Sequence, residues 1–201
     1  YLKTHLRGGG ASSDAAAVVG GYPTSTQTIE WDGSSWSSGG NLNTGRSVFG
    51  TFPSAPVDNV TVFGNVNITH DTEIYNGTAW SVGGNLIQAS KMTGAGGTNE
   101  GLYAGAECAV SAASPMTQLY QAVCSTTMCT AAGAWSVTNK NITPRTALGF
   151  SGTGTQNAVW LAGGGGPGLA SPQGTNATEL YDGTTWTTGN NIGVARLGRA
   201  S

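Results

Sequence analysis

The sequence contains few charged residues. Only 9% of its 201 residues are Asp, Glu, Lys or Arg, whereas about a quarter is typical of soluble domains. The net charge is −2, and the eight Lys and Arg residues are scattered along the chain. This distribution provides no basic patch for nucleic acid or for an anionic membrane. No apolar run approaches the roughly 18 residues that a membrane-spanning helix needs. We therefore expect no nucleic acid partner and no membrane insertion.

Cysteine and histidine are also scarce. Three cysteines are an odd number and too few for a disulfide framework, so we interpret them as free or buried small side chains. A disulfide between Cys124 and Cys129, closing a small loop in an oxidising compartment, is the alternative. No second cysteine pair or nearby histidine completes a zinc site. Serine-nucleophile, phosphate-loop and zinc-protease motifs are absent. The sequence therefore predicts no catalytic residue, no metal site and no cofactor.

Glycine, by contrast, is abundant, with 33 residues. In a helix interior each glycine costs about 1 kcal/mol relative to alanine, so long helices are not expected. Many short strands joined by tight turns suit this composition better.

One nine-residue phrase recurs along the chain. Residues 178–186 read Thr-Glu-Leu-Tyr-Asp-Gly-Thr-Thr-Trp, and residues 72–80 and 28–36 carry variants of it. A fourth copy begins at Thr117 and is interrupted before it reaches Trp135. The tryptophans follow one another at intervals of about 45 to 55 residues, a period typical of propeller blades with four strands each. Apolar and β-branched pieces punctuated by glycine within each unit predict such strands.

We therefore predict an all-β fold in which the whole chain belongs to one propeller domain. The predicted segments are the end of a preceding blade at 1–7, four blades at 8–45, 46–90, 91–144 and 145–195, and the start of a following blade at 196–201.

Two stretches depart from the repeat. Asp182-Gly183 is a tight hairpin signal, whereas the same place in the third unit holds an insertion at 121–132. The fourth unit has a long glycine-rich connection at 163–175. Because repetition does not explain these loops, we predict that they carry the interactions. The candidate residues are Gln121, Ser125, Thr126, Thr127, Met128, Pro167, Leu169, Ser171 and Gln173.

Residues that recur at one place in every unit are predicted to be structural, because they serve a packing task common to every blade. We expect the arginines to hydrogen-bond to carbonyl groups of neighbouring blades. Glu73 and Glu179 are predicted to be their partners rather than a catalytic pair. A sugar-stacking platform for the tryptophans and anion binding for the arginines are the functional alternatives. The repeated residues are Trp36, Trp80, Trp135, Trp186, Tyr75, Tyr120, Tyr181, Arg46, Arg145 and Arg196.

This pattern resembles the kelch repeat and the central domain of galactose oxidase-like proteins. The likeness rests on an apolar strand that ends in a glycine doublet, as at 18–21 and 160–164, on the aromatic residue of the third strand, on the tryptophan of the fourth strand, and on the basic residue that opens the next unit. The resemblance implies a β-propeller of four-stranded antiparallel blades. Four blades lie in this chain, and we expect them to be part of a larger ring; closure of four blades on themselves is the alternative.

The resemblance implies the fold of this family but not its activity. A galactose oxidase-type copper centre implies histidine and tyrosine ligands with a cysteine near one tyrosine. His5 and His70 are the only histidines, and no cysteine stands in a matching motif, so the family's redox activity is not expected here. The compact form of the phrase also resembles repeats in structural proteins of bacteriophages.

From these features we expect a non-enzymatic structural or adhesive module of a virion, in a phage tail, fibre or capsid surface. Its predicted partners are other protein chains of an assembly, together with a glycan or host receptor bound through the loops. The expected location is the virion or the extracellular space. The alternatives are a domain of a secreted carbohydrate-active oxidase or hydrolase with catalytic residues outside this chain, and a cellular kelch domain that binds a protein partner.

Overall fold

The computed structural model describes residues 6–52, 57–89, 94–96, 100–108, 112–124, 129–145, 155–165 and 174–196. These residues form four antiparallel sheets, so the all-β prediction is confirmed. No helix in the described part is both long and apolar enough to cross a membrane.

The first two sheets have four strands each, hydrogen-bonded in sequence order. The first sheet contains β1 (Arg7–Ser12), β2 (Ala15–Val19), β3 (Thr28–Trp31) and β4 (Trp36–Ser38). The second contains β5 (Gly50–Thr51), β6 (Thr61–Phe63), β7 (Thr72–Tyr75) and β8 (Trp80–Val82), with a single 3-10 turn, η1 (Val57–Asn59), before β6.

The third sheet also has four strands, and three strands of the fourth are described. The third contains β9 (Gly94–Gly96), β10 (Glu100–Cys108), β11 (Ala112–Cys124) and β12 (Cys129–Thr138). The fourth contains β13 (Val159–Ala162), β14 (Thr178–Tyr181) and β15 (Trp186–Thr188). Residues 146–154, near the start of this last unit, lie outside the described residues.

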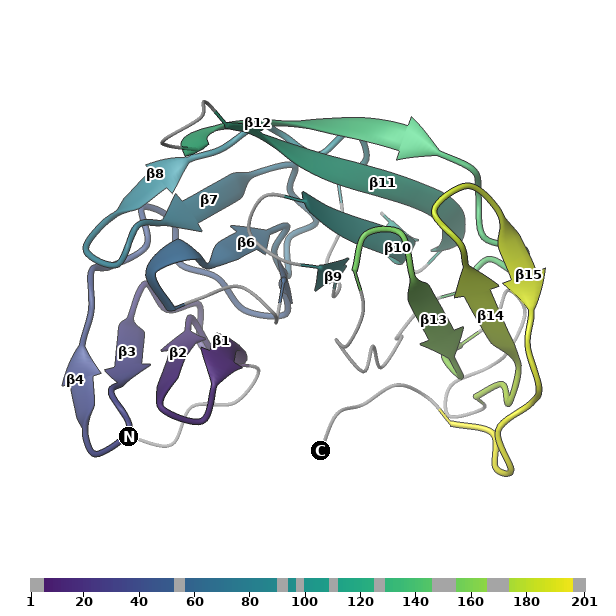
Figure 1. Ribbon diagram of the computed structural model, residues 1–201, viewed down its shortest axis with the longest axis horizontal. Helices are drawn as coiled ribbons and strands as arrows, with labels where there is room; N and C mark the ends of the chain where they lie inside the picture. The colour runs from purple at the N-terminus through teal and green to yellow at the C-terminus, as the bar shows by residue number, and fades with distance from the viewer. Residues whose placement is uncertain are drawn as a thin grey trace.

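The four sheets follow one another around an arc (Figure 1). In each sheet the first described strand lies on the inner side of the arc and the last on the outer side. Three clusters of buried side chains lie between successive sheets, and each combines residues of two neighbouring sheets. The core is therefore divided among the sheet-to-sheet interfaces.

Tight hairpins join the third and fourth strands of three sheets. Asp182 Oδ1 accepts hydrogen bonds from the backbone N–H groups of Thr184 and Thr185, at 2.8 and 2.7 Å. Gly183 has a φ of +93°, which L side chains rarely adopt. Asp32 and Asn76 make the same turn in the first and second sheets. The Asp-Gly and Asn-Gly pairs thus form the hairpin turns that the sequence predicts.

Candidate functional site

The second and fourth sheets each contain a buried ion pair between an arginine and a glutamate. Arg46 is fully buried, and its Nη2 atom lies 2.9 Å from Glu73 Oε1. Its Nη1 atom donates to the carbonyl oxygens of Gly64 and Asp71, at 2.7 and 3.1 Å. Since a buried charge is tolerated only when it is paired and hydrogen-bonded, these contacts account for an arginine at this place.

Arg145 repeats the arrangement in the fourth sheet. Its Nη2 atom lies 2.6 Å from Glu179 Oε1, and its Nη1 atom donates to the carbonyls of Gly163 and Ala177. The arginines thus pair with the glutamates, but their carbonyl acceptors lie in the same repeat rather than in a neighbouring blade. The reason is that each arginine lies beside the loop that connects the second and third strands of its own sheet, so the carbonyls of that loop are the nearest acceptors.

The third sheet replaces the charged pair with a neutral amide. Gln118 is fully buried, and its Oε1 atom accepts hydrogen bonds from the N–H groups of Ile87 and Gln88, at 2.8 and 3.2 Å. Glu73 receives equivalent bonds from Asn43 and Thr44 in the second sheet. The side-chain oxygen at this position therefore binds backbone of the preceding connection whether or not an arginine is present.

A tryptophan–threonine contact joins the second, third and fourth sheets each to the preceding sheet. The indole Nε1–H of Trp80 donates to Thr28 Oγ1 at 2.9 Å and to the carbonyl of Gly40 at 3.0 Å. Trp135 donates to the hydroxyl of Thr72, and Trp186 to that of Thr117 and the carbonyl of Asn139. Each of these threonines is the first residue of a copy of the repeated motif. The sequence does not show that they accept hydrogen bonds from the indoles, because this depends on how close the neighbouring sheet lies.

Tyrosines pack beside these tryptophans and are removed from water. Tyr75 and Trp80 lie 4.9 Å apart between ring centroids, and Tyr181 and Trp186 lie 5.0 Å apart. Burial raises the pKa of Tyr120 to about 12. Burial and the adjoining Glu30 carboxylate also raise the pKa of Tyr75. With their pKa values raised, the phenols of Tyr75 and Tyr120 are neutral at physiological pH.

The repeated positions at the two ends of the arc differ from those within it. Trp80, Trp135 and Trp186 are at most 8% exposed, whereas Trp36 is 54% exposed. Arg196 is likewise exposed and has no ion pair among the described residues. Trp36 therefore does not lie in an inter-sheet core, because it stands on the outer face of the first sheet, where no described sheet covers it.

The insertion in the third unit extends a hairpin. β11 and β12 continue past the Tyr120–Trp135 pair, with Val123 opposite Thr130 and Cys124 opposite Cys129 in the backbone register. The disulfide between these cysteines remains a prediction. Gln121 is exposed. The other predicted interaction residues lie outside the described part of the chain: Ser125, Thr126, Thr127, Met128, Pro167, Leu169, Ser171 and Gln173.

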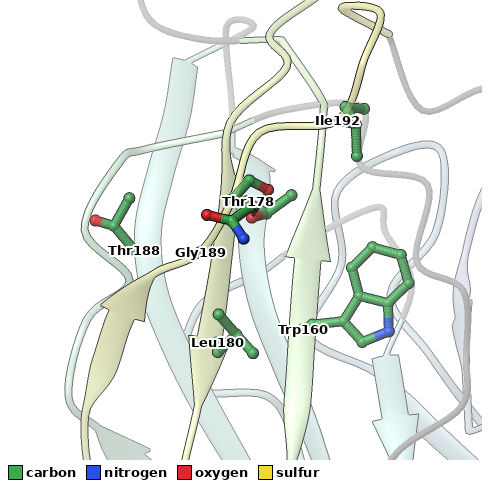
Figure 2. A pocket seen from close by; sticks show the side chains of 7 residues that line it. Trp160, Thr178, Leu180, Thr188, Gly189 and Ile192 are labelled. Atoms are coloured by element: carbon green, nitrogen blue, oxygen red, sulfur yellow. Dashed lines mark hydrogen bonds between the residues drawn. The ribbon is translucent and has the colours of Figure 1, made fainter.

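The cavities of the described part include two open ones. One, of about 540 Å³, lies on the fourth sheet and is lined by Trp160, Thr178, Leu180, Thr188, Gly189, Asn190 and Ile192 (Figure 2). The other, of about 570 Å³, is lined by Asn67, Ile68, His70, Ile87, Gln88, Ala89 and Met116. Its histidine contacts the carbonyl of Leu86 through Nδ1 at 2.7 Å. Both cavities are formed mainly by apolar and uncharged polar groups.

The described donors do not fit a copper centre of the galactose oxidase type. No group of three or more His, Cys, Asp or Glu side chains comes together within the described residues. The hydroxyl of Tyr75 donates to Glu30, and that of Tyr181 lies 2.9 Å from Thr138 Oγ1. These tyrosines act in contacts between sheets, so we derive no metal chemistry from them.

Comparison with known proteins identifies a similar fold. No protein-family model matches the sequence, and a search of curated proteins gives no match. Among solved structures, the chain is similar to a fungal alcohol oxidase of the AA5 family, determined in complex with copper. The two share 15% sequence identity with a TM-score of 0.66. The match covers 98% of this chain and 44% of the oxidase, so it shows a galactose oxidase-like fold over somewhat less than half of that protein's length.

Proposed function

We propose that this chain is a non-catalytic binding module whose sheets are blades of a β-propeller, with the four units bounded as the sequence predicts. The arc of sheets and the likeness to the AA5 oxidase support the propeller arrangement. The blades hold the loops in fixed positions, and the loops bind the partner. The partner we propose is a glycan or a protein receptor, and the setting is an extracellular or virion-surface assembly.

The observation that carries this proposal is the elongated β11–β12 hairpin. Its strands have 13 and 10 residues, whereas the corresponding strands β7 and β8 have 4 and 3. The Tyr120–Trp135 pair holds the same register as Tyr75–Trp80, so the extension begins where the ordinary turn would close the hairpin. Residues 121–124 of β11 and 129–134 of β12 therefore lie beyond the packing that every sheet shares, and this extension is available for binding.

A turn graft tests this function. Residues 121–134 are replaced by Asp-Gly-Thr-Thr, which joins Tyr120 to Trp135 as residues 182–185 join Tyr181 to Trp186. We expect the graft to keep the far-ultraviolet circular dichroism spectrum and the thermal midpoint, and to lose binding on a glycan array and to a panel of immobilised cell-surface proteins. The unaltered chain and a variant with Gln121→Ala are measured alongside. Equal binding by the grafted and unaltered chains would contradict the assignment.

The second candidate function is the propeller portion of a carbohydrate-active oxidase. It is favoured by the likeness to the AA5 alcohol oxidase over 98% of this chain, and it places the reactive groups outside the described residues. Copper titration with measurement of peroxide release from galactose and simple primary alcohols separates the two candidates. Stoichiometric copper binding with substrate-dependent peroxide release would replace the first candidate by the second.

A further inference from the structure

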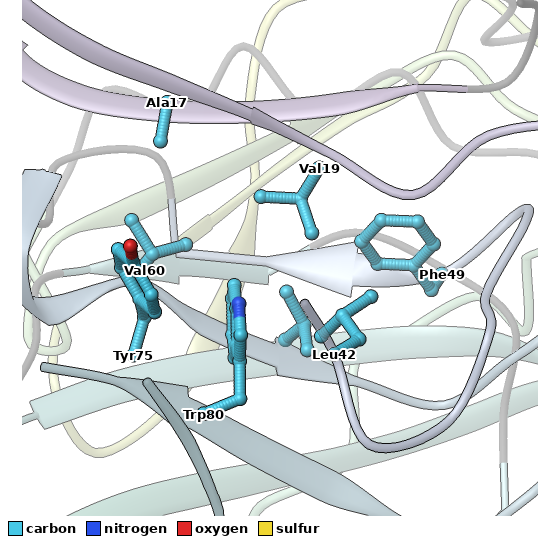
Figure 3. Close-up of a cluster of buried hydrophobic side chains, with 8 residues drawn as sticks. Ala17, Val19, Leu42, Phe49, Val60, Tyr75 and Trp80 are labelled. Carbon is cyan, nitrogen blue, oxygen red and sulfur yellow. The ribbon is translucent and has the colours of Figure 1, made fainter. Parts of the chain in front are cut away.

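The first interface shows how a sheet receives the aromatic residues of the next one. Trp80 lies beside Tyr75 and Leu42 and faces Val19 of the first sheet (Figure 3). Its indole N–H is held by Thr28 and by the carbonyl of Gly40. Thr28 is 2% exposed and Leu42 is 3% exposed, so the second sheet covers this receiving surface completely.

The fourth sheet carries the same receiving surface, and no described sheet packs on it. In phase with the repeated phrase, Thr178, Asn190 and Ile192 correspond to Thr28, Gly40 and Leu42. All three line the cavity on this sheet. Thr178 Oγ1 lies 2.7 Å from the carbonyl of Asn190, so an acceptor hydroxyl and an acceptor carbonyl stand side by side. These are the two groups that bind an indole N–H at the first and third interfaces.

Two large apolar side chains beside this cavity are exposed. Trp160 and Leu180 pair across β13 and β14 and are 41% and 47% exposed. Both side chains stand beside the cavity in Figure 2. The residue at the position of Leu180 in the second sheet, Ile74, is 9% exposed because the third sheet packs on it. Covering these two side chains removes their remaining apolar surface from water and so stabilises an association.

Arg196 adds a requirement for charge. Thr175 forms a β-bridge with it, as Ser25 does with Arg46, and Gly164 N–H donates to its carbonyl as Gly21 N–H does to that of Arg46. Its backbone is thus placed like that of an arginine that opens a sheet. The side chain, however, is exposed.

The face of the first sheet that carries Trp36 is the other face that no described sheet covers. It does not supply a carboxylate to pair with Arg196. On the first sheet, the half-buried Trp31 and the exposed Trp36 form an aromatic pair with ring centroids 5.4 Å apart. The position that Glu73 holds in the second sheet is Ile29 in the first. A second copy of this chain would therefore fill the cavity with Trp36 and leave Arg196 without a counter-charge.

We propose that the face of β13–β14–β15 that carries this cavity docks a further blade of the Thr-Glu-x-Tyr-x-Gly-x-x-Trp type. The tryptophan of that blade occupies the cavity, and its indole N–H donates to Thr178 Oγ1 and to the Asn190 carbonyl. The glutamate of the blade pairs with Arg196. The partner is defined by this chemistry and does not depend on which loops bind a glycan, so failure of the glycan experiment leaves the docking test unaffected.

The test supplies such a blade. The chain is extended after Arg196 with a second copy of residues 146–195, which brings Glu179 and Trp186 in the required phase. Hydroxyl-radical footprinting read by mass spectrometry reports the exposure of Trp160 and Leu180. We expect labelling of both to fall to the level of the buried Trp80 in the extended chain. A second extension with residues 47–90 provides the same test with an independent blade.

Arg196→Met is the matched variant. It leaves the thermal midpoint of the unextended chain unchanged, because the side chain is exposed there, and lowers that of the extended chain. Glu179→Gln in the appended copy likewise lowers the thermal midpoint of the extended chain. Three results would overturn the proposal: unchanged labelling of Trp160 in both extended chains, self-association of the unextended chain that Leu180→Asp abolishes, or protection of Trp160 in the unextended chain by galactose or N-acetylglucosamine.

Discussion

The second and third sheets solve one structural problem with different charges. Both place a side-chain oxygen of the third strand against the backbone of the preceding connection. The second sheet uses Glu73 and neutralises it with the buried Arg46. The third uses Gln118, and its sequence has Ser90 at the arginine position. The two positions therefore change together, and a carboxylate is present where a guanidinium must be neutralised.

This difference separates two tasks: binding the connection from the preceding sheet, and holding the loop between the second and third strands. Binding the connection requires only an acceptor oxygen, which an amide supplies at no cost in buried charge. Holding the loop between the second and third strands requires the arginine, whose Nη1 atom binds two carbonyls. Each sheet can thus lose the second task without losing the first.

Removing the carboxylate from the second sheet has the largest expected effect. Glu73→Gln leaves the guanidinium of Arg46 buried without a counter-charge, and we expect the free energy of unfolding to fall by about 3–5 kcal/mol. Urea denaturation measures this change. The exposed Glu100 provides a control, since Glu100→Gln should stay within about 0.5 kcal/mol. Equal effects of the two substitutions would contradict the role of the pair.

Converting the second sheet to the chemistry of the third should recover most of that loss. The double variant Arg46→Met with Glu73→Gln removes both charges and keeps the amide acceptor. Replacing a buried ion pair by apolar and neutral groups is often close to neutral for stability. The same denaturation series measures it. A double variant as unstable as Glu73→Gln alone would show that the charge-matching explanation is wrong.

The reverse change in the third sheet should have a smaller effect. Gln118→Glu buries a carboxylate that keeps its two backbone N–H donors but gains no cation among the described residues, and we expect a loss of about 1–3 kcal/mol at pH 7. The loss should shrink as the pH is lowered, because protonation removes the buried charge. Denaturation at several pH values compares the variant with the unaltered chain. A loss that does not depend on pH would contradict this explanation.

The smallest expected effect concerns the hairpin turns. Hydrogen bonds from the N–H groups of Thr185 and Thr184 lower the pKa of Asp182. This contribution to stability is therefore present above the unfolded-state pKa of about 3.9 and is lost as the pH falls through the folded-state pKa. Asp182→Asn should flatten this part of the acid titration. The third sheet has Gln121 at that place and provides the internal comparison; an unchanged acid profile in Asp182→Asn would contradict the turn's role.

The repeat predicted the strands because apolar pieces, glycine turns and the Tyr–Trp spacing are all local features. It also placed Arg46 and Glu73 together, since an arginine and a glutamate recur at the same two places in the fourth unit. It did not show that the arginine binds carbonyls of its own sheet, because that depends on how the loop closes. It also did not distinguish the exposed Trp36 from the buried Trp80, because burial depends on which sheet lies next to each one.

The candidate site was less predictable for the same physical reason. The receiving surface on the fourth sheet consists of Thr178, Asn190 and Ile192, which look like ordinary members of a repeat in the sequence. Their significance comes from comparison with the covered equivalents at the first interface. The loops chosen for their irregularity, by contrast, fall largely outside the described residues, so their role stays a prediction.

The second, third and fourth sheets are each attached to the preceding sheet by a tryptophan that is inserted against a threonine. A double-mutant cycle on Trp80 and Thr28, with Trp80→Phe and Thr28→Val, tests this central claim most directly. Residues in direct contact show coupling of about 0.5–3 kcal/mol, and we predict a value in that range from urea denaturation. Strictly additive effects of the two substitutions would contradict the claim.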